Sequence, residues 1–389
     1  MASIKLLLKT NKKTETGHYP LYLRVIQDRK TRFISLGIKL VKSQWDEANQ
    51  RVKKSHPNSA RVNALISKKK AEVEAVTLEM DIEGTAMSKN SFQIVKGKSK
   101  YDFFQYADDY LARIESKGKV GTYRRAKYTL EKLKTYHNSQ SLPFKEITVS
   151  YLKNYEQYLA DILGNQPNTI HSNFKIIRTV LNSAVNEDLM LRDKNPFYKF
   201  KIKSTPTTKA FLTEKEIEAM DQLKLEKGTN LFDHRNMYVF ATYAGGLRIS
   251  DMLNLKWSNF DGTHITVATL KTGSTVSIKV PSRALEILGL YSTEKNNPKH
   301  FIFPVLQKDF DKLTPNAKHL AIASATALIN KNLKTIAKRA KIEKSISFHT
   351  SRHTFGTRAL RKGMRIEYVS KLMGHSTIKE TQIYAKIVN

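Results

Sequence analysis

The chain has 389 residues, and its 67 Lys and Arg against 35 Asp and Glu give a formal net charge of +32. The length suggests two or three domains, and a hydrophobic fraction of 40% argues against a chain that is disordered throughout. Because cysteine is absent, a disulfide scaffold, a thiolate zinc site and a cysteine nucleophile are excluded, while the charge indicates a polyanionic partner, either nucleic acid or an anionic membrane surface.

Residues 1–56 show the period-two alternation that is typical of β-strands. The alternating runs are Ile4-Leu6-Leu8, Leu21-Leu23-Val25 and Phe33-Ser35-Gly37. The same segment holds 13 Lys and Arg against 4 Asp and Glu, a net charge of +9. A small three-stranded sheet with basic hairpin tips can bind in a DNA groove or along phosphates. A solvated basic β-module fits the charge equally well.

The middle of the chain reads as helices separated by linkers. Residues 58–83 have a helical pattern, and the polar stretch that begins at Gly84 predicts a linker. Helix after helix follows over residues 101–200, which predicts a compact four-helix module. The basic segment 201–210 predicts a second linker. We therefore expect domains at 1–90, 101–200 and 207–389.

The last part of the chain combines helices with one β-hairpin. Thr213 and Glu216 form a predicted capping box at a helix start, and helices continue to about Leu255. Alternation on both sides of Thr272-Gly273 predicts the hairpin, and helices return from Ala317 onward. The predicted fold class is therefore a multidomain, mainly α protein with small β-sheets.

Four places in this last part carry chemistry-bearing residues. Arg248 stands near a helix start, where backbone N–H groups already favour an anion. Lys271 lies at the predicted hairpin tip. His349 and Arg352 are three residues apart on one helix and so share a face, which suits binding of a phosphodiester together with proton transfer. The fourth place is LMGHSTIKETQIYAKI.

In this fourth motif His375 precedes a predicted capping box of Thr377 and Glu380, and the helix that starts there carries Tyr384. Each motif has a plainer interpretation when it is taken alone. A lone arginine is more often a surface charge, most of the 17 tyrosines belong to the core or its rim, and His375 by itself could cap a turn. His349 and His353 have a spacing that could hold zinc, but no glutamate beside them and no cysteine supports such a site.

Together, these motifs resemble the tyrosine site-specific recombinases of the integrase family, most closely the mobile-element integrases of Bacteroidetes-type bacteria. The residues that carry the resemblance are G-L-R-I-S, the hairpin lysine, H-x-x-R, L-M-G-H-S and a Tyr nine residues after that His. The helical region that ends NEDLMLRDKNPF is similar to the family's SAM-like core-site-binding domain, and the N-terminal β-module is similar to its arm-site-binding domain. The resemblance implies an α+β catalytic domain at the C-terminal end.

The resemblance also implies six catalytic residues. They are Arg248, Lys271, His349, Arg352, His375 and Tyr384. Tyr384 would attack the scissile phosphate and form a 3′-phosphotyrosyl link, while Arg248 and Arg352 would neutralise charge on the non-bridging oxygens. Lys271 would protonate the leaving 5′-oxygen, His349 would handle the tyrosine proton and His375 would hydrogen-bond the phosphate. We expect neither a metal ion nor ATP as a cofactor.

The implied function is recombination between two double-stranded DNA sites by a homotetramer, through a Holliday junction, to integrate or excise a mobile element. Expected partners are core and arm DNA sites, with a host DNA-bending protein or an excisionase as accessory factors. Alternatives are an invertase that switches a host promoter, a relaxing enzyme of the type IB topoisomerase kind, and a non-catalytic architectural DNA-binding protein. Complete occupancy of the six positions argues against the last of these.

The chain departs from the family pattern at two places, one beside Arg248 and one after Tyr384. Asp251 stands where the family often has glutamate, a shorter carboxylate that can still support Arg248. Only AKIVN follows Tyr384, so the way in which protomers grip one another is open. No stretch approaches the roughly 20 apolar residues of a membrane span, no signal-peptide cleavage site is evident, and no basic amphipathic helix indicates a membrane surface. We expect a cytoplasmic, nucleoid-associated protein.

Overall fold

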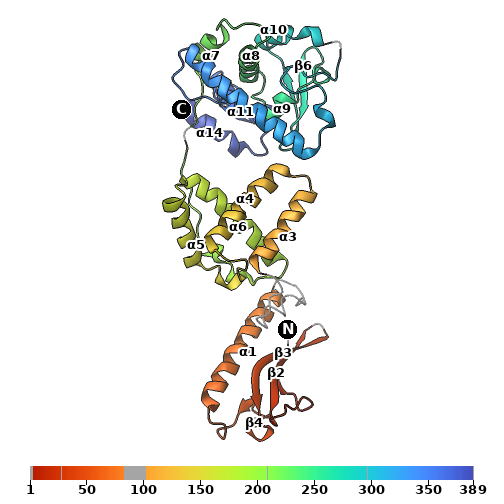
Figure 1. The fold of residues 1–389 in the computed structure, drawn as a ribbon, viewed down its shortest axis with the longest axis vertical. Helices are drawn as coiled ribbons and strands as arrows, with labels where there is room; N and C mark the ends of the chain where they lie inside the picture. Colours follow the sequence, from red (N-terminus) through yellow and green to blue (C-terminus); the bar gives the residue numbers. More distant parts are fainter. Residues whose placement is uncertain (1–2, 28, 83–101, 208, 296, 389) are drawn as a thin grey trace. The chain divides into compact units, whose positions relative to one another are not determined.

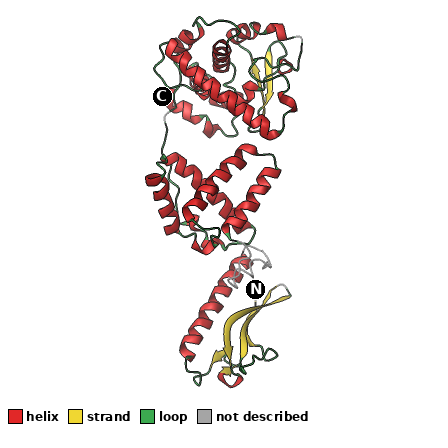
Figure 2. Ribbon diagram, in the orientation of Figure 1, coloured by secondary structure: helices red, strands yellow, loops and turns green. Residues whose placement is uncertain are grey.

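The computed structural model describes residues 3–27, 29–82, 102–207, 209–295 and 297–388 (Figure 1). The chain separates between Thr205 and Pro206 into two compact units. The predicted linker that begins at Gly84 lies outside the described residues. Within these ranges, strands form an N-terminal sheet, a short two-stranded ribbon and one hairpin in the C-terminal unit, and the other regular elements are helices (Figure 2).

The N-terminal sheet contains the three predicted strands. Strands β1 (Ser3–Leu8), β2 (Tyr19–Gln27) and β3 (Lys30–Leu40) pair antiparallel in the order β1-β2-β3. The face that is packed into the module's core carries Leu6, Leu8, Leu21, Leu23, Val25, Ile34 and Leu40. In β3 the inward residue is thus Ile34, because the register pairs Phe33 with Arg24 and places both on the opposite face. The predicted alternation through Phe33 marks the solvent face of that strand.

A short ribbon and a long helix complete this module. Strands β4 (Trp45–Asp46) and β5 (Arg51–Val52) follow the 3-10 turn η1 (Lys42–Gln44), and the sequence pattern did not predict them. Helix α1 (Ser59–Ile82) agrees with the predicted helical segment. Its buried residues Ile66 and Val73 join the core cluster of the sheet. The helix therefore closes the apolar face that three strands alone would leave exposed.

The helical module has the four expected helices. They are α3 (Phe103–Ser116), α4 (Val120–His137), α5 (Val149–Gln157) and α6 (Pro167–Asn186), with 3-10 turns η2 (Phe144–Glu146), η4 (Arg192–Lys194) and η5 (Pro196–Tyr198). The predicted third helix ran to Leu163, but its last turn is the π-helical η3 (Tyr158–Ile162). The core is rich in aromatic residues, among them Phe103, Tyr155 and Phe174, which are fully buried.

The C-terminal unit is a helical body with one β-hairpin. Its helices are α7 (Glu214–Asp221), α8 (Asn230–Tyr243), α9 (Ile249–Leu253), α10 (Ser282–Gly289), α11 (Pro315–Arg339), α12 (Phe348–Arg361), α13 (Ile366–Leu372) and α14 (Gln382–Val388). Strands β6 (His264–Ala268) and β7 (Thr275–Lys279) form the hairpin. The 3-10 turns are η6 (Trp257–Asn259), η7 (Ser292–Glu294), η8 (Phe310–Lys312) and η9 (Ile378–Glu380). The Thr213–Glu216 capping box at the start of α7 is confirmed.

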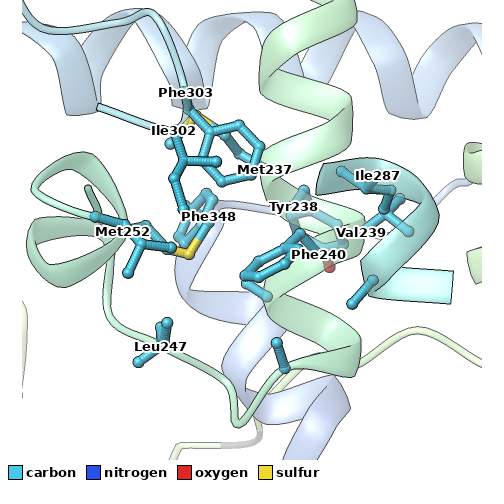
Figure 3. Close-up of a cluster of buried hydrophobic side chains, with 14 of the residues drawn as sticks. Met237, Tyr238, Val239, Phe240, Leu247, Met252, Ile287, Ile302, Phe303 and Phe348 are labelled. Carbon is cyan, nitrogen blue, oxygen red and sulfur yellow. The ribbon is translucent and has the colours of Figure 1, made fainter. Parts of the chain in front are cut away.

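Helix α8 is the centre of this unit. It is buried on nearly all sides and packs against α7, α10, α11 and α12. Figure 3 shows Met237, Phe240, Phe303 and Phe348 meeting around it. Close packing of α12 against this enclosed helix fixes the position of α12, which carries His349, Arg352 and His353. In the described part of the chain, no helix is long and apolar enough to cross a lipid bilayer.

Candidate active site

Two glycines bring the turn before Arg248 against helix α12. Gly245 and Gly246 have φ of +67° and +59°, which side chains with a Cβ rarely adopt. A Cβ on Gly246 would lie only 3.2 Å from the Cα of Arg352. Arg248 is the N-cap residue of α9, as its predicted place near a helix start requires. The glycine pair therefore places two arginines that are 104 positions apart in the sequence on adjoining elements.

Arg352 is a buried cation held by neutral groups. Its side chain is 3% exposed, Nη1 donates to the carbonyl of Gly246 at 2.8 Å, and Nη2 donates to the carbonyl of Met373. Burial, followed by the charge of Arg248, lowers its pKa to about 10, so the guanidinium stays charged at neutral pH. Because carbonyl oxygens hold it rather than a carboxylate, its charge remains available to an anion.

Arg248 adds a second guanidinium to the same place. Its Nη2 donates to the carbonyl of Gly374 at 3.4 Å, and its Nη1 is buried without a hydrogen-bond partner among the described residues. Two guanidiniums that approach each other repel unless an anion lies between them, and an unpaired N–H of this kind can donate to a phosphate oxygen. The Arg248–Arg352 pair, called the cradle below, can therefore hold one anionic group such as a phosphate.

Asp251 links Arg248's helix to the hairpin. It is 2% exposed, and its Oδ1 accepts a hydrogen bond from the backbone N–H of Leu270 at 2.9 Å. Burial raises the pKa of this carboxyl, while the Leu270 N–H and the charges of Arg248 and Arg352 lower it. Since Leu270 is the residue before Lys271, the bond fixes the backbone from which the lysine extends.

Lys271 lies in the turn between β6 and β7, as predicted, and its side chain is exposed. The N–H of Gly273 donates to the carbonyl of Thr269 at 2.8 Å and closes the turn. The lysine makes no hydrogen bond to the other five candidates within the described residues. Its charge nevertheless contributes to lowering the pKa of His349 and of His375, after desolvation and the nearer arginines.

The turn after α13 packs against that hairpin. Gly374 has a φ of +61°, and a Cβ there would lie 3.2 Å from Val276 Cγ1 on β7. The next residue, His375, shares a 2.8 Å hydrogen bond between its Nδ1 and Thr381 Oγ1. Desolvation and then the charge of Arg352 lower its pKa to about 4, so the ring is neutral.

The capping box predicted for Thr377 and Glu380 is wrong. Residues 378–380 form a 3-10 turn, and Thr377 makes no capping bond with its side chain. Glu380 Oε1 instead accepts from Ser376 Oγ at 3.0 Å, and Thr381 is taken by His375. Tyr384 therefore lies on a separate helix, α14, rather than on one that starts at this motif.

Tyr384 is a buried tyrosine at the end of this cluster. It is 2% exposed, and its hydroxyl shares a 3.1 Å hydrogen bond with Nδ1 of His353. Its ring lies over Gly356, where a Cβ would come within 2.9 Å of Cδ2. Burial raises its pKa, while the charges of Arg352 and Arg248 lower it. The Tyr384 hydroxyl is thus close enough to Arg352 and Arg248 to feel both of their charges.

His349 and Arg352 lie on one helix, as expected. His349 is accessible to solvent, and its ring contacts that of His353 edge-on, with centroids 4.5 Å apart. Desolvation lowers the pKa of His349, and Arg352 and Lys209 lower it further. Within the described residues, no group of three or more His, Asp or Glu side chains could hold a metal ion.

The structure thus gathers Arg248, Arg352, His375 and Tyr384 beside the middle of α12. His349 lies one turn away at the start of that helix, and Lys271 lies on the hairpin turn. Sequence reasoning weighed His353 only as a metal ligand with His349, and it did not single out Gly356. The four-residue spacing of the two histidines was the available signal, because it puts both rings on one face of a helix.

Comparisons with known proteins match three successive segments of the chain. The arm DNA-binding domain matches residues 6–93, the phage integrase SAM-like domain matches 102–202, and the phage integrase family matches 210–388. A tyrosine recombinase of Thermosipho africanus is 27% identical, over 72% of this chain and 93% of that protein. Tyrosine recombinase XerD of Lacticaseibacillus casei is also 27% identical, over 62% and 87%.

Two solved structures share the fold. A lambda integrase tetramer bound to a Holliday junction covers 95% of this chain and 96% of its own, with a TM-score of 0.54 at 14% identity. The Tn1549 transposon integrase in complex with a circular intermediate DNA covers 73% and 94%, with a TM-score of 0.52 at 18% identity.

An arm DNA-binding domain, a SAM-like core-binding domain and this C-terminal unit together define a site-specific tyrosine recombinase. The chain belongs to the phage integrase family. It is an enzyme, since cleavage and rejoining of DNA strands is characteristic of that family. The domain boundaries at 1–90, 101–200 and 207–389 stay predictions, as does the likeness to Bacteroidetes-type integrases.

Proposed function

We propose that this recombinase integrates and excises a mobile element by cutting DNA with Tyr384. The observation that best supports this proposal is that the Tyr384 hydroxyl lies beside Arg352. The same chain therefore provides both the tyrosine and the Arg248–Arg352 cradle. A phosphate bound in that cradle would present its phosphorus to the tyrosine oxygen. Attack would form the 3′-phosphotyrosyl bond and release a free 5′-hydroxyl, which conserves the energy of the phosphodiester for rejoining.

The six residues would share the work as follows. Arg248 and Arg352 would bind the non-bridging oxygens and stabilise the charge that develops on the pentacoordinate phosphorane. Lys271, exposed on its turn, would donate a proton to the leaving 5′-oxygen. His375, whose Nδ1 is engaged by Thr381, would offer Nε2–H to the phosphate. His349 would assist removal of the tyrosine proton.

The N-terminal module offers a face suited to arm-site DNA. On the side of the sheet opposite its core, Lys5, Arg24 and Phe33 lie in one row across the three strands. The ammonium of Lys9 lies 4.1 Å from the centre of the Phe33 ring and 5.0 Å from that of Tyr22. A basic row interleaved with aromatic rings can bind phosphates and pack against sugars at once.

Assembly and biological role extend this proposal. We expect a homotetramer that exchanges strands through a Holliday junction, since a lambda integrase with the same fold is solved in that state. The Tn1549 integrase, a transposon protein, supports a mobile element as the substrate. Host bending proteins or an excisionase would set direction, and the reaction would take place at the nucleoid in the cytoplasm. Inversion of a promoter remains the alternative outcome of the same chemistry.

The test is a suicide substrate that traps the covalent adduct. The Tyr384→Phe variant should give no adduct and keep its DNA affinity, because it loses a single oxygen. Tyr368→Phe is the matched control: that tyrosine is 58% exposed, and its loss should leave the adduct yield unchanged. An adduct formed by Tyr384→Phe would refute the assignment. Paired sites in direct and inverted orientation on one plasmid then separate excision from inversion.

A further inference from the structure

We propose that His353 is the residue that receives the proton of Tyr384 during cleavage. This inference rests on the proposed role of Tyr384 as nucleophile. It goes beyond the six residues above, because among the described residues His353 is the imidazole that the tyrosine hydroxyl reaches.

The geometry is specific. His353 Nδ1 lies 3.1 Å from the Tyr384 hydroxyl, and the two ring centroids are 5.5 Å apart at 49°. Gly356, one turn further along α12, leaves room for the Tyr384 ring to lie against the helix. The side chain of His353 is only 5% exposed, so water does not compete for this bond. Acceptor and donor are therefore held together before any DNA binds.

The other two imidazoles are less well placed for this task. His349 makes no hydrogen bond within the described residues, and it meets Tyr384 only through the ring of His353. His375 lies parallel to the Tyr384 ring with centroids 6.4 Å apart, and its Nδ1 is occupied by Thr381. His353 thus stands between the buried phenol and the solvent-accessible His349.

His353 is neutral and can therefore accept the proton of Tyr384. Desolvation lowers its pKa to about 4, and the charges and dipoles that face it act in the same direction: His349 and Arg352 from α12, and Lys209 from the segment before α7. The ring is therefore neutral at physiological pH. With Nδ1 accepting from the phenol, the ring proton lies on Nε2.

The step balances without any other reactant. The O–H bond of Tyr384 breaks as an N–H bond forms at His353 Nδ1, and the oxygen's electron pair forms the bond to phosphorus. The P–O5′ bond breaks, and the leaving oxygen takes a proton from Lys271. On rejoining, the incoming 5′-hydroxyl gives its proton back to Lys271, and His353 returns its own to the tyrosine oxygen.

The experiment is single-turnover cleavage of a suicide substrate by the full-length protein over about pH 5.5 to 9. His353→Gln keeps a group that can accept a hydrogen bond but cannot take the proton. We expect cleavage about 100-fold slower near pH 7, with a rate that rises about tenfold per pH unit because the phenol must then ionise unaided. The wild-type rate should be nearly flat over this range. His349→Gln should slow cleavage less and keep the flat profile.

Other outcomes overturn the inference. A wild-type rate for His353→Gln, or a slow rate with a flat profile, means that His353 packs or positions the tyrosine without taking its proton. Tyr384→Phe is run beside it: an adduct in that variant refutes the proposed function as well, whereas its absence leaves the proposed function intact. DNA affinity reports whether His353→Gln is folded. If it is not, 15N-histidine NMR of the wild type decides, since a doubly protonated His353 at pH 7 would refute the inference.

Discussion

The ring of Tyr384 lies on Gly356, at a distance that leaves no room for a Cβ on that helix residue. The contact joins α14 to α12, so Tyr384, the proposed nucleophile, is positioned by the same helix that provides Arg352 and His353. Small displacements of α14 should therefore change the rate of cleavage.

Replacement of Gly356 by Ala should displace the tyrosine. The new methyl group would lie 2.9 Å from Cδ2, and relief of that overlap must move the ring away from His353 and the arginines. We expect cleavage at least tenfold slower with DNA affinity within twofold of wild type. Gly289→Ala is the matched control, because nothing lies within 4 Å of its Cβ position on helix α10. Equal cleavage rates for the two variants would contradict this account of the contact.

Replacement of Lys271 by Ala should make the cleavage rate depend on how readily the 5′ leaving group departs without a proton. Without the ammonium, the 5′-oxygen must depart as an alkoxide, and we expect cleavage about 100-fold slower or more. A substrate with sulphur at the bridging 5′ position needs no such proton, because a thiolate leaves readily. The variant should cleave that substrate at nearly the wild-type rate. A defect of equal size on both substrates would assign Lys271 to binding instead.

Replacement of Asp251 by Ala should slow cleavage in the same way as Lys271→Ala, but to a smaller extent. It removes the acceptor of the Leu270 N–H in a part-buried hydrogen bond, at a cost of about 0.5–1.5 kcal/mol in unfolding free energy. It also frees the turn that carries Lys271, so part of the cleavage defect should disappear with the sulphur substrate. Asp251→Asn keeps an oxygen acceptor and should fall between this variant and wild type. Urea unfolding measures the loss of stability, and cleavage rates on the oxygen and sulphur substrates measure the effect on Lys271. A cleavage defect of equal size on the two substrates would rule out the link to Lys271.

Acid should destabilise the folded protein through buried histidines. His234 and His353 have folded pKa values of about 4 against an ordinary 6.5, in both cases mainly because burial disfavours the charged ring. Between these values the unfolded chain binds more protons, so stability is complete above about pH 6.5 and falls as the pH drops towards 4. Each histidine contributes at most about 1.4 kcal/mol per pH unit.

The urea midpoint measured at about pH 7 and about pH 5 checks this. The wild type should lose stability between the two, and His353→Gln should lose less, since it has one titrating ring fewer. A midpoint that does not change with pH would show that these rings are solvated in the folded state.

Much of the candidate site could be predicted from short spacings. His349 and Arg352 fall on one face because a helix returns to the same side every three to four residues, and Lys271 is at a turn because strands alternate on both sides of Thr272-Gly273. These are local rules, and the structure keeps them. The Thr377–Glu380 capping box failed, and Glu380 accepts a hydrogen bond from Ser376 instead. A spacing rule does not distinguish between such partners.

The sequence by itself determined the charge, the helical and strand segments of each region, and the six residues whose motifs resemble a recombinase. Only the tertiary structure decided which of them meet. The Arg248–Arg352 cradle depends on Gly246 packing against α12, and the His353–Tyr384 bond joins residues 31 positions apart. The reason is physical: chemistry at a phosphate needs groups within about 3 Å of one another, and it is the packing of glycine turns and helices, rather than order along the chain, that sets distances on that scale.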